Sequence, residues 1–274
     1  LGVELSVLTG TGAGGTISRA DVEAAAAGAT LPVTDAGDDR SRRETRIPVR
    51  GVRKHTAAAM VASAFTAPHV TEFVTVDVTP TMELRSRVQV MPEFAGVKVS
   101  PLLFVVKALL LAVARHPDIN SSWDEAAQEI VVKDYVHLGI AAATPRGLLV
   151  PNIKDADRLS LVELARALQS LTETARAGKT APGDMTGGTI TITNVGVFGV
   201  DSGTPILNPG EAAILCFGAV RPMPWVVDNQ VVVRQVTQLS LSFDHRVVDG
   251  QLGSMFLADL ARVLADPATA LAWG

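Results

Sequence analysis

The spacing of hydrophobic and polar positions separates a sparse N-terminal part of the chain from a dense remainder that begins near Thr45. Apolar residues at helical spacing predict helices over residues 51–65, 81–88, 101–115, 160–177 and 250–264. Alternating or continuous apolar segments predict strands over residues 69–78, 129–133, 136–143, 148–153, 188–196, 212–220, 224–227 and 230–243. The last two strands meet at Asp228-Asn229, a hairpin turn. Because strands and helices do not alternate strictly, the pattern predicts an α/β sandwich with a mostly antiparallel sheet.

The N-terminal part contains Gly10, Gly12 and Gly15 in the spacing G-x-G-x-x-G, which opens dinucleotide-binding units. In such a unit the helix begins within the glycines and a second parallel strand follows it. Here Ser18 and Asp21 have the spacing of a capping box, so the helix starts three residues past the glycines. No apolar strand follows that helix. The glycines therefore indicate a loop rather than a phosphate-binding site.

Composition narrows the class of protein. A chain of 274 residues with 47% apolar and 19% charged residues can bury a full-sized core, and a formal charge of -4 gives no reason to expect nucleic acid as a partner. The longest apolar run is interrupted by Lys107 and falls short of the roughly 18 residues of a membrane span. The single cysteine, Cys216, excludes an intrachain disulfide. We expect a cytoplasmic protein without a nucleic-acid, membrane or metal partner.

Three segments follow from these patterns. Residues 1–27 hold the glycine loop and the short helix. Residues 28–44 hold Gly, Pro, Thr, Asp and a run of charged residues with almost nothing to bury, which predicts a flexible linker. Residues 45–274 contain the remaining elements and are expected to form the main domain.

Histidine is the side chain whose charge changes near neutral pH, so the five histidines are the first candidates for catalysis. Four are expected at surface, capping or packing positions: His55, His69, His116 and His137. His245 differs, because it stands between an apolar strand and a helix, and Asp249 and Gly250 follow it in the spacing H-x-x-x-D-G. A turn with a capping aspartate and a solvated histidine explains the same spacing, so the pattern alone leaves both interpretations open.

The segment SFDHRVVDG resembles the active-site signature of the dihydrolipoamide acyltransferases, the core subunits of 2-oxo acid dehydrogenase complexes. Further segments resemble that family in the expected order over residues 45–274: PHVTEFVTVDVT, HPDINSSWDE, VHLGIAAATPRGLLVPNIKDAD, GGTITITNVGVFG and TPILNPGEAAILCFGAV. The resemblance implies a fold similar to chloramphenicol acetyltransferase, a two-layer sandwich of helices and a mixed, mostly antiparallel sheet.

Residues 1–27 resemble the second half of the peripheral subunit-binding domain of the same family, a small helical module that docks the decarboxylase or the dihydrolipoamide dehydrogenase. The sequence departs from that module at Thr16, where a basic residue is usual. Coenzyme A is implied as a substrate. The lipoyl group is expected on a domain outside this chain.

The resemblance also implies roles for individual residues. His245 would be the general base that deprotonates a thiol, and the hydroxyl of Thr193 would donate a hydrogen bond to the oxyanion of the tetrahedral intermediate. Asn194 is the nearest alternative donor, and Asn194 and Gly250 are expected to contact substrate. Asp249 would hold the turn that presents His245, through backbone hydrogen bonds or a buried ion pair.

Two further residues complete this assignment. Arg53 is the candidate partner of Asp249 in a buried ion pair. Cys216 lies in an apolar strand, where burial raises the pKa of a thiol, and is expected to fill the core rather than act as a nucleophile.

The resemblance leaves several alternatives for the reaction and the assembly. The run Val-Pro-Asn-Ile-Lys favours a branched-chain acyl group, with acetyl and succinyl as alternatives. A non-catalytic structural core component would have lost His245, and an acetyltransferase acting on an antibiotic would lack residues 1–44. The family implies a homotrimer that assembles into a cubic or dodecahedral core through its C-terminal segment, where Leu271 and Trp273 are apolar.

Overall fold

The computed structural model describes residues 3–28, 43–144 and 147–273. The chain divides into two units, Leu1–Val49 and Arg50–Gly274. Most of the predicted linker, 28–44, lies outside the described residues, so its flexibility stays a prediction.

Among its described residues, the N-terminal unit contains one α-helix, α1 (Arg19–Ala26), and its start agrees with the sequence analysis. Ser18 caps the helix, and its hydroxyl accepts from the N–H of Asp21 while the Asp21 carboxylate accepts from the Ser18 N–H at 2.7 Å. The same carboxylate accepts from the hydroxyl of Thr11 at 2.6 Å. Gly10 packs so closely on Thr16 that a Cβ would stand 2.4 Å from its carbonyl. The glycine loop thus packs against its own backbone.

The second unit holds six helices and ten strands among its described residues. The helices are α2 (Val52–Thr66), α3 (Thr79–Val88), α4 (Pro101–Arg115), α5 (Leu161–Arg176), α6 (Gly250–Ala265) and α7 (Thr269–Trp273). The strands are β1 (His69–Asp77), β2 (Ser121–Asp124), β3 (Glu129–Val132), β4 (Leu138–Thr144), β5 (Gly147–Leu149), β6 (Asn152–Ile153), β7 (Ile190–Asn194), β8 (Ala213–Phe217), β9 (Arg221–Val227) and β10 (Gln230–Asp244).

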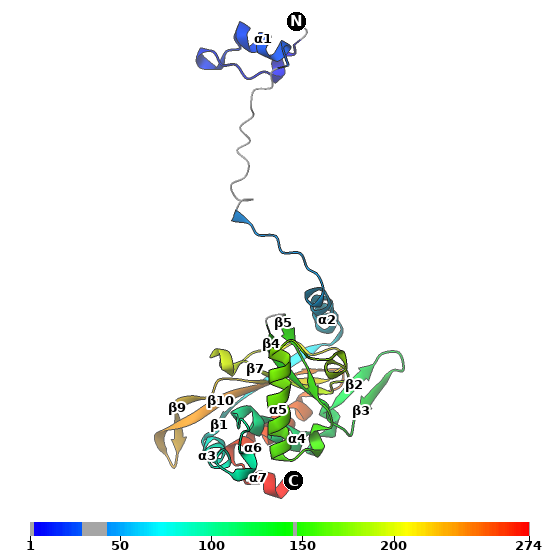
Figure 1. The fold of residues 1–274 in the computed structure, drawn as a ribbon, viewed down its shortest axis with the longest axis vertical. Coiled ribbons are helices and arrows are strands. Elements are labelled where there is room, and N and C mark those ends of the chain that lie inside the picture. The colour runs from blue at the N-terminus through cyan, green and yellow to red at the C-terminus, as the bar shows by residue number, and fades with distance from the viewer. Residues whose placement is uncertain (1–2, 29–42, 145–146, 274) are drawn as a thin grey trace. The chain divides into compact units, whose positions relative to one another are not determined.

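Eight strands form one mixed sheet in the order β1-β10-β8-β7-β4-β5, with β9 paired to β10 and β6 paired to β4 (Figure 1). Only β4, β7 and β8 run parallel to one another among the described strands, so the predicted mostly antiparallel sheet is confirmed. Strands β2 and β3 form a separate hairpin. Asp228 and Asn229 both adopt positive φ in the turn between β9 and β10, as a tight hairpin requires.

The two faces of the sheet have different character. Helices α4, α5 and α6 cover one face, where apolar side chains alternate along the strands and reach zero exposure at Leu239, Leu241 and Phe243. The other face, here called the polar face, carries short side chains such as Ser240 and Ser242 at the intervening positions of β10. The sheet therefore buries its apolar side under helices and keeps hydroxyl groups on its second side.

The structure differs from the predicted elements at short, polar or proline-containing segments. The single strand expected over 148–153 is two strands, β5 and β6, interrupted near Pro151, which has no N–H to donate to a ladder. Strand β2 was not predicted, since Ser-Ser-Trp-Asp shows no clear alternation. Strand β9 begins at Arg221 and includes two prolines, which it tolerates because only β10 pairs with it.

The C-terminal segment forms α7, and its two apolar residues have different environments. Leu271 is 88% exposed. Trp273 instead packs on the core, with the guanidinium of Arg115 4.1 Å from its ring centroid. Within the described ranges, no helix combines the length and apolar character that crossing a membrane requires.

Candidate active site

The turn that follows β10 carries His245, the histidine singled out by the sequence analysis. His245 is exposed, and its backbone N–H donates a 2.9 Å hydrogen bond to the carbonyl of Pro68. It lines a surface depression of about 390 Å³ together with His116, Asp118 and Met255. The imidazole is thus open to a substrate while its backbone is held by the sheet.

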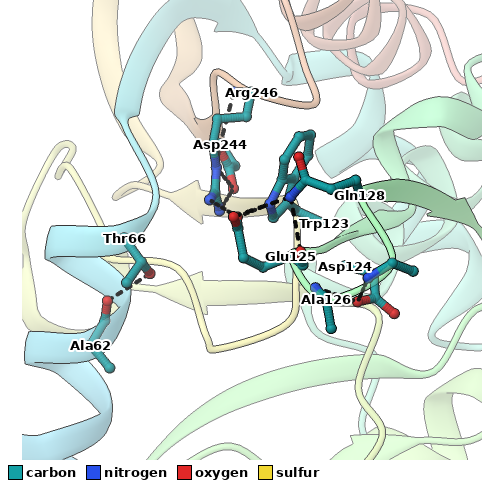
Figure 2. A network of polar contacts seen from close by, with 10 residues as sticks. Ala62, Thr66, Trp123, Asp124, Glu125, Ala126, Gln128, Asp244 and Arg246 are labelled. Carbon is teal, nitrogen blue, oxygen red and sulfur yellow. Dashed lines mark hydrogen bonds and ion pairs between the residues drawn. The ribbon is translucent and has the colours of Figure 1, made fainter.

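Asp244 and Arg246, on either side of His245, form a clamp that fixes this turn (Figure 2). Asp244 is 4% exposed, and its carboxylate accepts from the backbone N–H of Arg246 and from its guanidinium, the shortest bond being 2.7 Å. The carbonyl of Asp244 accepts from the N–H groups of Val247 and Val248. The hydrogen bonds to Asp244 raise the pKa of Arg246, so its guanidinium stays charged at neutral pH.

The clamp is joined to the β2–β3 hairpin. One guanidinium nitrogen of Arg246 lies 3.8 Å from the Glu125 carboxylate, and its Cζ lies 5.1 Å from the ring centroid of Trp123. The indole N–H of Trp123 donates to the same Glu125 oxygen at 2.6 Å, and Gln128 donates to the other oxygen at 3.1 Å. Figure 2 shows these side chains gathered around Glu125. The sequence analysis missed this network, because the hairpin and the turn lie far apart in the chain.

Asp249 is the N-cap of α6 rather than a member of a buried ion pair. It is exposed, and its Oδ1 accepts a 2.8 Å hydrogen bond from the N–H of Leu252. The ion pair considered with Arg53 is not formed, and Arg53 is exposed on α2. The first N–H groups of a helix have no partner within the helix, and here the Asp249 carboxylate accepts a hydrogen bond from one of them. Gly250 is the first residue of α6 and adjoins the same turn.

Thr193 lies on the polar face near the C-terminal end of β7. It stands in register with Ala141 of β4 and Cys216 of β8, and it is half-buried. Within the described part of the chain, no residue forms a hydrogen bond with its hydroxyl. The hydroxyl is therefore free to donate to a bound molecule.

Asn194 faces the opposite side of the sheet, because successive strand residues alternate. It lines a cavity of about 480 Å³ with Lys98, Arg176 and Phe217, and its Oδ1 has no partner among the described residues. Asn194 and Thr193 therefore do not serve one site on the polar face as alternative donors.

A single copy of the chain does not bring His245 and Thr193 together. Thr193 is in register with Cys216, and Cys216 with Ser240, so the three residues lie in one row across β7, β8 and β10. His245 follows five residues beyond Ser240, which is about 17 Å along the strand at roughly 3.4 Å per residue. Two strand spacings separate them laterally as well.

The other four histidines and Cys216 lie at hydrogen-bonded, exposed or core positions. His69 is held between two backbone groups at 2.7 and 3.0 Å, and the Nε2 of His116, which ends α4, lies 2.9 Å from a carboxylate. His137 accepts from a backbone N–H at 3.1 Å, and His55 is exposed on α2. Cys216 is 1% exposed, and burial raises the pKa of its thiol. The prediction that Cys216 fills the core is confirmed.

Glu211 is a buried carboxyl that the sequence analysis did not single out. It is 8% exposed, and its Oε1 lies 3.4 Å from the amide nitrogen of Asn208, while its Oε2 has no hydrogen-bond partner among the described residues. Burial raises the pKa of Glu211 to about 7, against the opposing effects of Thr191, Asn208 and the charge of Lys133. Its place directly before an apolar strand was the available signal.

The Glu211 carboxyl predicts a pH dependence of stability. Because its pKa is raised on folding, the stability it contributes is fully present below pH 4.5 and is lost as the pH rises through about 7. At about 1.4 kcal/mol per pKa unit, the loss is about 3 kcal/mol. Urea unfolding at several pH values should show wild-type stability falling relative to Glu211→Gln over that range. A constant difference between the two proteins would contradict the assignment.

Comparison with known families defines the class of protein. Residues 41–272 match the model of the 2-oxoacid dehydrogenases acyltransferase (catalytic domain) family, so this chain belongs to that family. The chain is 37% identical over 282 residues to the dihydrolipoyllysine-residue acetyltransferase component of the pyruvate dehydrogenase complex of Bacillus subtilis. That match covers 97% of this chain and 64% of the relative, so the chain spans just under two thirds of the relative's length.

Solved structures agree with the family. The dihydrolipoamide acetyltransferase of Azotobacter vinelandii, studied for the role of a serine, a histidine and an asparagine in its catalytic mechanism, is 34% identical with a TM-score of 0.79, over 88% of this chain and 98% of that one. The cubic core of a pyruvate dehydrogenase multienzyme complex gives the same values. Chloramphenicol acetyltransferase is 13% identical with a TM-score of 0.51, over 80% and 99% of the two chains. It confirms the predicted fold class.

Proposed function

We propose that this chain transfers an acyl group between the thioester of dihydrolipoamide and coenzyme A within a 2-oxo acid dehydrogenase complex. One observation carries the proposal: in the Azotobacter relative the serine precedes the histidine, and the asparagine follows it, at the sequence intervals that Thr193 and Asp249 keep from His245. Thr193 stands where the relative has serine, and threonine also has a hydroxyl. Asp249 stands where it has asparagine, and aspartate caps a helix as well as asparagine does.

The arrangement supports a direct transfer. The neutral imidazole of His245 takes the proton of the coenzyme A thiol, and the thiolate attacks the carbonyl carbon of the acyl-dihydrolipoamide thioester. The Thr193 hydroxyl donates a hydrogen bond to the resulting oxyanion. When the carbon–sulfur bond to dihydrolipoamide breaks, the leaving thiolate recovers the proton from the imidazolium. No acyl-enzyme is required.

We infer that each active site combines two copies of the chain. His245 and Thr193 of one copy are too far apart to act on one thioester carbonyl, since each must lie within hydrogen-bond reach of the reacting atoms. A neighbouring copy that presents its His245 to the polar face near Thr193 solves this problem. The homotrimer implied by the family resemblance provides such an arrangement.

The acyl group is the finer part of the proposal. The sequence pattern favoured a branched-chain group, but the relatives described above are named as acetyltransferases, which supports acetyl instead. Steady-state rates with acetyl-, isobutyryl- and succinyl-coenzyme A as donors to dihydrolipoamide distinguish the three. Turnover with none of them would reject the catalytic proposal in favour of a structural core component.

Assembly gives a separate prediction. Leu271 is 88% exposed on α7, and an apolar side chain so placed is suited to contact between trimers. Removing 271–274 is expected to reduce a large core to trimers, as measured by light scattering. A full-length chain that is monomeric would contradict the proposal.

The N-terminal unit is proposed to be part of a peripheral subunit-binding domain. Its capped helix and its closely packed glycine loop support a small folded module. The decarboxylase and the dihydrolipoamide dehydrogenase are the partners that such a module would dock. A pull-down of each component by this chain and by residues 45–274 tests the assignment.

A further inference from the structure

A segment between β7 and β8 lies across the polar face of the sheet. We call it the cover segment, residues 199–211, and it contacts one side chain on each of three strands: Thr191 of β7, Cys216 of β8 and Ser240 of β10. The amide nitrogen of Asn208 donates to the first of these at 2.8 Å. Because Cys216 is in register with Thr193, the cover segment lies beside the proposed oxyanion donor.

His69, the first residue of β1, binds the cover segment through its imidazole. Its Nδ1 lies 2.7 Å from the carbonyl oxygen of Ala67, and its Nε2 lies 3.0 Å from the backbone nitrogen of Leu207. A carbonyl oxygen can only accept a hydrogen bond and a backbone N–H can only donate one, so Nδ1 carries the proton and Nε2 accepts. The contacts therefore require a neutral imidazole in one tautomer.

The same imidazole supports the turn of His245. The residue before His69 is Pro68, whose carbonyl accepts the 2.9 Å hydrogen bond from the backbone N–H of His245. His69 is also in register with Asp244, the residue before His245. Because the ring of His69 is bonded on both sides, the chain between α2 and β1 is held in place, and with it the backbone of the proposed general base.

The strands next to His69 offer no free partner to a protonated imidazole among their described residues. The Asp244 carboxylate lies on the same face and is bound by Arg246, which also pairs with Glu125. Glu72 of β1 points to the opposite face, where it accepts from a serine of α6 at 3.1 Å. The acidic side chains of these strands near His69 are therefore already paired.

Helix α2 and the cover segment offer no free carboxylate either. Residues 56–66 of α2 include no charged side chain, and the cover segment has two acids, Asp201 and Glu211. Asp201 pairs with Arg221 at 2.7 Å. Burial raises the pKa of Glu211 to about 7, so this carboxyl is mostly uncharged in mildly acidic solution. A proton added to the imidazole would therefore face an N–H without a carboxylate to stabilise it, and the bond to the cover segment would be lost.

We propose that His69 is a positioning residue for acyl transfer: as a neutral imidazole it holds the cover segment beside Thr193 and supports the turn of His245, and its protonation releases the cover segment. The catalytic part of this inference rests on the proposed function, since Thr193 and His245 are the groups that it positions. His69 itself binds no substrate and takes no part in the bond changes.

Hydrogen–deuterium exchange, followed by mass spectrometry of peptides from the cover segment, tests the structural part without using activity. Wild type is compared with His69→Gln, because a glutamine oxygen can accept from the Leu207 N–H but takes up no proton near neutral pH. Between about pH 7.5 and about pH 5, the exchange rate of the cover segment in wild type relative to this variant should rise roughly fivefold, the effect of one hydrogen bond. A ratio that does not change with pH would overturn the proposal.

His55→Gln is the matched control, since it removes another imidazole, which is exposed on α2. The exchange rate of the cover segment in wild type relative to this variant should not depend on pH. A rise of the same size in acid would show that the effect does not come from the bonds of His69, which rejects the assignment.

Kinetics test the catalytic part. At about pH 7.5, His69→Gln should keep kcat within a few-fold of wild type, while His69→Leu, which can bond neither backbone group, should lower kcat roughly tenfold with little change in KM. The carbonyl of Leu207 also accepts from the hydroxyl of Ser63 at 2.7 Å, so both variants should remain folded, which thermal unfolding verifies. Normal kcat in folded His69→Leu would reject the positioning role.

The pH profile gives a second kinetic test. The kcat of wild type relative to His69→Gln should fall roughly tenfold between about pH 7.5 and about pH 5, because only wild type loses the bond to the cover segment. Equal acid limbs in the two proteins would contradict the inference. If wild type shows no acyl transfer, the proposed function and the catalytic part are both wrong, and the exchange ratio still decides whether His69 holds the cover segment. If acyl transfer occurs and the exchange ratio is constant, the proposed function stands and this inference is wrong.

Discussion

Replacing His245 by alanine is expected to lower kcat for acyl transfer by roughly 10²- to 10⁴-fold, the range that general acid–base catalysis contributes. The imidazole makes only a long ring contact with Phe243, with the two centroids 6.0 Å apart, and the turn is held by Asp244 and Arg246 through their own hydrogen bonds. Thermal stability and core size should therefore remain near wild type. Steady-state kinetics and light scattering on the same preparation measure both.

A matched histidine variant serves as the control. His55→Ala removes an exposed imidazole from α2 and should leave kcat unchanged. If His245→Ala retains near-normal kcat while folded and assembled, the general base is a different group. If it fails to assemble, His245→Asn keeps a polar side chain of similar reach, and its kcat decides the same question.

Replacing Thr193 by valine is expected to lower kcat by roughly 10²- to 10³-fold with little change in substrate affinity. The hydroxyl would donate only to the oxyanion, so its loss raises the energy of the transition state and not that of the bound substrate. Valine is nearly isosteric with threonine and favours strands, so β7 should be preserved. Thr193→Ser should recover much of the rate. Near-normal kcat in the valine variant would assign the oxyanion to another donor.

The same two variants test whether one site uses two copies. Chains carrying His245→Ala and chains carrying Thr193→Val, unfolded together and reassembled, place an intact histidine opposite an intact threonine in roughly one quarter of the interfaces of a random mixture. Activity should return to about that fraction. If both groups acted within one copy, every site would lack one of them and the mixture would stay inactive.

The long periodic elements could be predicted from the sequence, because burial dictates their pattern. Helix α4 occupies the predicted residues, and the apolar stripe of α5 is buried at Leu164, Ala165 and Leu168. Strand β2 was not predicted, and β6 was predicted only as part of one longer strand over 148–153, since segments of two to four residues are too short to show a periodicity of their own. The local sequence pattern does not show which strand such a short segment pairs with.

The candidate site shows the same limit. The position of His245 between a strand and a capped helix was visible in sequence, because Asp249 marks the start of α6. The partners of Arg246 were not, because Trp123 and Glu125 reach it only through folding. Glu211 was missed for a similar reason: its burial depends on a cavity wall assembled from several separate segments.

The row formed by Thr193, Cys216 and Ser240 gives this protein a native reporter of local unfolding. Cys216 is the only thiol in the chain and is 1% exposed, so an alkylating reagent reaches it only when the structure around it opens, including the segment at Gly203 that lies against its Sγ. Under fast reclosing, the labelling rate equals the rate for a free thiol multiplied by the opening equilibrium constant. Because Cys216 is in register with Thr193, the measurement gives the free energy of the opening that exposes the polar face beside Thr193, without any added label.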